Sequence, residues 1–77
     1  MNSDDVYRNY LHDLGILIKE MALEAKVKAA ASGDSFDVGY MAGFHRVVSL
    51  MQQQGEAFGV PMKAIGLDGI DPDQELV

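Results

Sequence analysis

The sequence predicts an all-α fold, a long antiparallel helical hairpin followed by a short C-terminal helical turn or tail. Two long stretches repeat apolar residues at spacings of three and four, which is the pattern of one face of an α-helix. Between them, Gly33 can end a helix in the left-handed conformation, and Asp34 can cap the next one. Two helices joined by so few residues run antiparallel.

The first helix is expected from about residue 4 to residue 31. Ser3 is expected to cap it, and Asp4 and Asp5 suit the positive end of the helix dipole. Apolar residues continue at helical spacing along most of the segment, at Tyr7, Tyr10, Leu11, Leu14, Leu17, Ile18, Met21, Ala22, Ala25 and Ala29. An apolar stripe of this length requires a packing partner.

The second helix is expected from about residue 35 to residue 58, with Asp34 or Ser35 as its cap. Gly59 and Pro61 end it, because glycine adopts the left-handed conformation and proline cannot continue a helix. Its apolar face comprises Phe36, Tyr40, Met41, Phe44, Val47, Val48, Met51 and Phe58.

Residues 1–60 therefore form the predicted hairpin, and residues 61–77 form a short helical turn plus an acidic tail. The stretch 61–65 is expected to make one turn closed by Gly66, and Asp71-Pro72 can start a last short helix. A mobile or loosely docked tail is expected, since acids recur at Asp68, Asp71, Asp73 and Glu75.

The small residues predict where the two helices approach most closely. In a hairpin that turns near Gly33, Ala25 faces Ala42, and the glycines of the second helix lie near the same level. Close helix packing is expected from Gly39, Ala42, Gly43, Ala22, Ala25 and Ala29. The sequence leaves open whether this contact lies within one chain or across a dimer.

Size and composition favour a homodimer. A chain of 77 residues buries only about 60% of its unfolded surface, so a lone monomer is marginal. The chain has no cysteine and hence no disulfide or thiolate metal site to support a small core. Two hairpins that cover each other's apolar stripes form a four-helix bundle, which is the expected assembly.

The charge balance argues against direct binding to nucleic acid or to an anionic membrane. Twelve acidic residues against six basic ones give a net charge of −6. The sequence shows neither the basic region and apolar core of a secretion signal nor an apolar run of about 20 residues that could span a bilayer. We therefore expect a soluble, cytoplasmic protein.

No pattern typical of catalysis, cofactor binding or metal binding is present. His12 and His45 lack a second ligand at metal-site spacing. Gly39-x-x-x-Gly43 is not a phosphate loop, since it lacks the strand-to-helix turn. The acidic tail lacks the residue order of a calcium loop. We expect a protein that is not an enzyme and that holds no cofactor or metal.

Residues 7–26, YRNYLHDLGILIKEMALEAK, and residues 39–61, GYMAGFHRVVSLMQQQGEAFGVP, resemble short, acidic helical proteins encoded by bacteriophages and prophages. The resemblance implies a context and no site residues. Small phage proteins of this kind often bind and modulate a host protein, such as a transcription regulator or a defence complex.

The function expected from these observations is a non-enzymatic interaction module, a homodimer that binds and modulates another protein. Its apolar stripes exceed what one hairpin can cover. The residues expected to contact the partner are Tyr7, Tyr10, Arg46, Gln53 and Gln54. Two alternatives stay open: an acidic decoy that blocks the nucleic-acid site of a DNA-binding protein or defence complex, and a structural subunit of a larger assembly.

Overall fold

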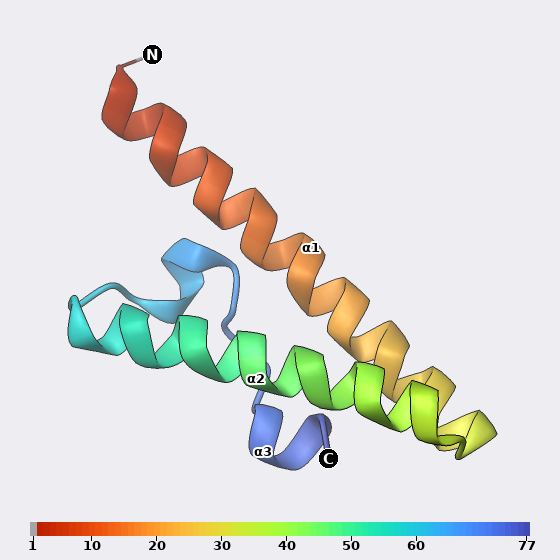
Figure 1. Cartoon of the computed structure of the whole chain (residues 1–77). Helices are drawn as coiled ribbons and strands as arrows, with labels where there is room; N and C mark the ends of the chain where they lie inside the picture. The colour runs from red at the N-terminus through yellow and green to blue at the C-terminus, as the bar shows by residue number, and fades with distance from the viewer. Residues whose placement is uncertain (1) are drawn as a thin grey trace.

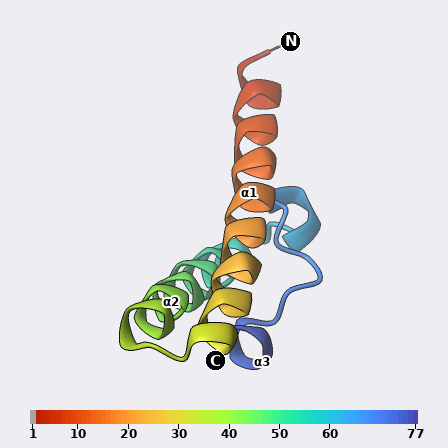
Figure 2. The same ribbon diagram turned by 90° about the vertical axis from the view of Figure 1, so that its right-hand side faces the viewer.

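The computed structural model describes residues 2–77, and it confirms the all-α hairpin. The elements are α1 (Ser3–Ser32), α2 (Ser35–Ala57), the 3₁₀ helix η1 (Met62–Ile65) and α3 (Pro72–Glu75). The long helices run antiparallel and diverge from the turn at Gly33, so that they form a V (Figure 1). The chain after α2 returns to this V, and η1 lies in its opening and packs against both long helices (Figure 1). In the view of Figure 2, the returning segment, in blue, runs to the right of α1, and the N-terminal part of α2, in green, runs to its left.

The turn between the helices follows the sequence signals. Gly33 adopts a φ of 65° and donates its N–H to the carbonyl of the preceding turn. Asp34 caps α2 by accepting a hydrogen bond from the N–H of Asp37 at 2.8 Å. The buried Asp37 carboxylate in turn accepts the Ser32 hydroxyl at 2.6 Å. Both ends of the turn are therefore fixed by local hydrogen bonds.

The start of α1 differs from the prediction. Asn2 is the cap, since its Oδ1 accepts the N–H of Asp5 at 2.9 Å, and Ser3 is already the first helical residue. The expectation that Ser3 caps the helix is wrong by one position. Asparagine and serine are similarly good caps, so the sequence did not distinguish them.

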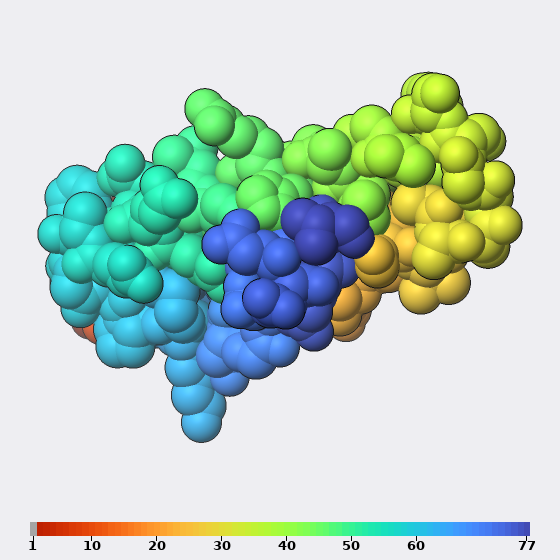
Figure 3. Space-filling view, turned by 90° about the horizontal axis from the view of Figure 1, so that it is seen from below, coloured from red at the N-terminus to blue at the C-terminus, as the bar shows by residue number. Residues whose placement is uncertain are grey.

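The C-terminal segment is part of the core, and the expectation of a mobile or loosely docked tail is wrong. Leu67 and Leu76 are each only 1% exposed, and with Ile70 they pack against Ala22 of α1 and Val48 of α2. Figure 3 shows this segment, in blue, covering the underside of the long helices. Its acids are exposed, and the apolar residues between them dock.

The short elements of this segment form where the sequence places them. Gly66, with a φ of 69°, closes η1 as predicted, and Gly59 follows α2 with a φ of 70°. Asp71 precedes α3 and accepts the N–H of Asp73 at 3.1 Å, so Pro72 occupies the first helical position.

The closest backbone contact lies between α1 and η1. A Cβ atom added to Gly15 would stand 1.6 Å from the carbonyl oxygen of Ile65. A Cβ atom on Gly66 would stand 2.6 Å from the carbonyl oxygen of His12. Only glycine fits at either position, since it lacks that atom.

Within the chain, the expected close packing at Gly39, Ala42 and Gly43 is not made. All three residues are exposed, and a Cβ atom on either glycine would meet no heavy atom of residues 2–77 within 4 Å beyond the helix's own neighbourhood. Ala25 and Ala29 of α1 are buried, but they pack against Met41 and Phe44 of α2. Turning larger side chains inward buries more apolar area.

Substitution by alanine should change the free energy of unfolding in opposite directions at a packed glycine and at an exposed one. Gly15→Ala should lower the free energy of unfolding by more than about 2 kcal/mol, because the new methyl group meets backbone that cannot move aside. Gly39→Ala should raise it by up to about 1 kcal/mol, the difference in helix propensity. Urea unfolding of dilute protein, followed by circular dichroism, measures both. Equal effects would contradict the packing described.

The docking of the C-terminal segment is tested by truncating a buried side chain. Leu67→Ala should cost about 2–5 kcal/mol of unfolding free energy, because it leaves a cavity in the main core. The control, Val77→Ala, removes an exposed side chain and should change it by less than about 0.5 kcal/mol. Thermal and urea unfolding report the difference, and an unchanged Leu67→Ala variant would mean that the segment is loosely attached.

Candidate interaction surface

The V has two broad sides, and the chain covers only one of them. On the covered side, the ammonium group of Lys19 on α1 donates to the carbonyl of Asp68 at 2.9 Å. The amide of Gln52 on α2 donates to the carbonyls of Leu67 and Ile70, at 3.2 and 2.9 Å. These bonds hold the C-terminal segment to both long helices.

Of the two histidines, one helps to hold the C-terminal segment to α2, and the other lies beside its own neighbour on α1. His45 Nε2 lies 2.9 Å from Asp73 Oδ1 and so joins α2 to α3. His12 Nδ1 lies 3.8 Å from its neighbour Asp13. Among residues 2–77, the structure forms no group of three or more His, Cys, Asp or Glu side chains placed to hold a metal ion.

The opposite side of the V is uncovered and apolar. Because each residue turns by about 100° around a helix, the residues that face away from Lys19 and Gln52 gather on this side. Their side chains are exposed or half-buried, with Phe36 at 75% and Tyr7 at 72%. We call this surface the apolar face, formed by Tyr7, Tyr10, Leu14, Leu17 and Met21 of α1 and Phe36, Tyr40, Val47, Leu50 and Phe58 of α2.

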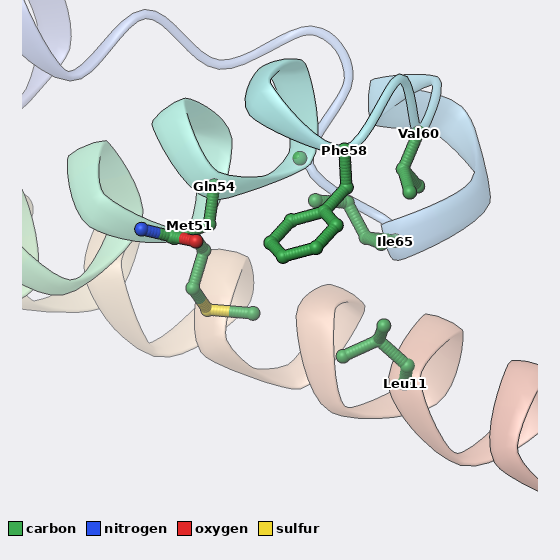
Figure 4. Close-up of a pocket in the computed structure, with 7 residues that line it drawn as sticks. Leu11, Met51, Gln54, Phe58, Val60 and Ile65 are labelled. Carbon is green, nitrogen blue, oxygen red and sulfur yellow. The ribbon is translucent and has the colours of Figure 1, made fainter.

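A hollow opens on this side where the two helices diverge. Figure 4 shows Met51 and Phe58 of α2 pointing toward Leu11 of α1 across the opening. The hollow measures about 250 Å³ and has Gln54 as the polar side chain among its lining residues. This volume falls below the roughly 300–1,000 Å³ of small-molecule sites. The hollow is therefore of a size for an inserted apolar side chain.

Aromatic rings stack along α2 toward the turn. Phe36 stacks on Tyr40 with ring centroids 6.2 Å apart, and Tyr40 meets Phe44 edge-on at 5.2 Å. Next to this row, Gly39 and Gly43 leave a shallow hollow bounded by Tyr40, Phe44 and Val47. These contacts place three aromatic side chains next to one another on α2, in the stacked and edge-on arrangements that aromatic pairs prefer.

The residues predicted to contact a partner fall into two places. Tyr7 and Tyr10 lie on the apolar face, and Gln54 lines the hollow. Arg46 and Gln53 lie together on the outer edge of α2, in a shallow dent with Ser49 and Leu50. The structure thus does not bring the five residues into one site.

Sequence reasoning missed the role of Gln52. Three consecutive glutamines cover most of the circumference of a helix, so one of them had to face a neighbour, but the sequence did not show which. Gln52 faces inward and bonds the returning chain, while Gln53 and Gln54 stay exposed.

Comparison with known proteins does not place this chain in a family. A scan against protein-family models, a search of curated proteins and a search of solved structures each found no match. In the part of the chain that the structure describes, no helix is long and apolar enough to cross a membrane. Its function is therefore inferred from the geometry of the chain itself.

The hydrogen bonds of Gln52 to the returning chain can be tested by comparing substitutions at Gln52 and at its exposed neighbour Gln53. Gln52→Leu should cost about 1–3 kcal/mol of unfolding free energy, because it leaves two partly buried carbonyl groups without their donor. The matched variant Gln53→Leu, at an exposed position of the same helix, should stay within about 0.5 kcal/mol. Urea unfolding of the two variants measures the difference, and equal costs would contradict the assigned role.

Proposed function

We propose that this chain is a non-enzymatic protein-interaction module that forms a homodimer and binds and modulates a further protein through its apolar face. The observation that carries the proposal is the uncovered side of the V, where large apolar side chains from both long helices stand next to one another. Contiguous exposed apolar surface marks binding sites for other proteins.

The spacing of these side chains supports a helical partner. On α1 the intervals from Tyr7 through Tyr10, Leu14 and Leu17 to Met21 alternate between three and four residues. Such a stripe packs into a facing helix as knobs into holes. Two copies whose apolar faces cover each other would form a four-helix bundle, the assembly expected from the sequence.

The hollow supports recognition by an inserted side chain. Leu11, Met51 and Phe58 offer it an apolar lining, and no charged residue contributes. Tyr7 and Tyr10 stand further along the same side of α1, and tyrosine is among the residues that most often dominate binding energy at protein interfaces. The resemblance to phage-encoded proteins adds a host protein as the partner class.

A charge placed on the apolar face tests the proposal. Val47 and Val38 both lie on α2 and are similarly exposed, at 42% and 44%, but their spacing of nine residues places them on opposite sides of the helix. Val47→Glu should weaken self-association at least tenfold, because it places a carboxylate in an apolar contact. Val38→Glu should leave self-association unchanged.

Sedimentation equilibrium over a range of concentrations measures both variants and the unmodified chain, with circular dichroism to verify that the helices form. If the unmodified protein shows the monomer mass of 8.4 kDa at every concentration, the homodimer is ruled out. Equal effects of the two variants would mean that self-association does not use the apolar face.

A further inference from the structure

The chain leaves as much surface uncovered as a protein interface buries. Its accessible surface is 5298 Å², against ~4,600 Å² for a compact monomer of its mass. Its radius of gyration is 13.6 Å, against ~11.5 Å for a compact chain of this length. The surplus area approaches the ~800 Å² that each partner buries in a standard interface. The elongated shape thus exposes an extra area about as large as one side of a protein interface.

Charge distinguishes the two halves of the apolar face. The α2 stripe, which we define as Phe36, Tyr40, Gly43, Val47 and Leu50, contains no charged residue, and a basic residue, Arg46, borders it at Leu50. The stripe on α1 continues instead into Glu24 and Lys28 and is flanked by Asp13 and Glu20. In a two-fold contact, residues near the axis meet their own equivalents, so charges there would repel. Because the chain has a net charge of −6, the uncharged α2 stripe is the part suited to a second copy.

The α2 stripe is also complementary to itself. Its intervals of four and three residues are those of coiled-coil packing. When two copies run antiparallel about an axis at Gly43, Phe36 faces Leu50 of the second copy, and Tyr40 lies within about 1.5 Å, along the helix axis, of the level of Val47 of the second copy. Gly43 then meets its own equivalent, where the absence of a Cβ atom lets the backbones approach closely. Each large aromatic ring is thereby placed against a smaller aliphatic side chain.

We infer that the α2 stripes of two copies pack antiparallel about Gly43 and that this contact forms the homodimer. The inference rests on the self-association proposed above and adds the helix and the register that produce it. It also gives the exposed glycines a role, since a Cβ atom on Gly43 contacts nothing within 4 Å in residues 2–77 outside its own helix neighbourhood. The N-terminal half of the α1 stripe and the hollow then stay open for the further protein.

Cysteine cross-linking tests the register directly, because the chain has no cysteine of its own. Positions 40 and 47 lie about 10.5 Å apart along one helix, too far for a disulfide within the chain. Under mild oxidation the double variant Tyr40→Cys/Val47→Cys should form a covalent dimer. Each single variant should not, since in the antiparallel register position 40 meets position 47. The α1 pair Tyr10→Cys/Leu17→Cys, with the same spacing, is the matched control and should not cross-link.

The outcomes separate this inference from the function on which it rests. Cross-linking of the single variants would show a parallel pairing, and cross-linking of the α1 pair alone would show the wrong helix. Either result overturns the inference while the homodimer stands. An unmodified chain that sediments as a monomer would overturn both.

A second pair of variants tests the same contact without cysteine. Gly43→Leu should weaken the dimer at least tenfold, because it fills the point of closest approach, where a Cβ atom meets no heavy atom of residues 2–77 outside its own helix neighbourhood. Ala42→Leu adds bulk to the neighbouring exposed position outside the stripe, and its dimer should keep the original dissociation constant. Sedimentation equilibrium measures both. Equal dissociation constants for the two variants would overturn the inference.

Discussion

The contact of α1 with the chain around Ile65 and Gly66 is the constraint on which the rest of the structure depends. At Gly15 the helix has no side chain, and the backbone of the returning segment occupies the space where one would stand. This close approach places Ile65 and Leu67 against the inner faces of both long helices. It also fills the V on one side, so the helices diverge without leaving an empty centre.

Because the returning segment packs on one side of the V, the two sides of the hairpin differ. The same residues that hold the C-terminal segment, Lys19 and Gln52 among them, lie on one side of the V. Each long helix packs against the other and against the C-terminal segment. The apolar residues on the remaining side are exposed or half-buried among residues 2–77.

Much of the fold could be predicted from the sequence, because its signals are local. Helical spacing located the two long helices, and Gly33, Gly59 and Gly66 marked the chain reversals through their left-handed conformation. The face that each helix buries could not be predicted in the same way. Phe36 and Tyr40 fit a helical face as well as Met41 and Val48 do, and only the tertiary structure shows which pair lies inside.

Contacts between residues far apart in the sequence could not be predicted. Gly39 and Gly43 have the spacing of a close-packing motif but make no such contact within residues 2–77, whereas Gly15, which stands alone, does. The acids near the C-terminus suggested a mobile tail because their charge is visible locally, while the docking of Leu67 and Leu76 depends on a groove formed by two distant helices. The candidate partner contacts stay a prediction, and the sequence did not show that Arg46 and Gln53 lie on another part of the surface than Tyr7 and Tyr10.

The central claim is that the chain covers one side of its hairpin and leaves the other side apolar and open. Hydroxyl-radical footprinting of dilute protein tests it by comparing leucines, which have the same intrinsic reactivity. We expect Leu17 and Leu50, on the apolar face, to be modified readily, and Leu67 and Leu76, whose buried side chains dock the C-terminal segment, to be protected. Similar rates at all four leucines would contradict the account.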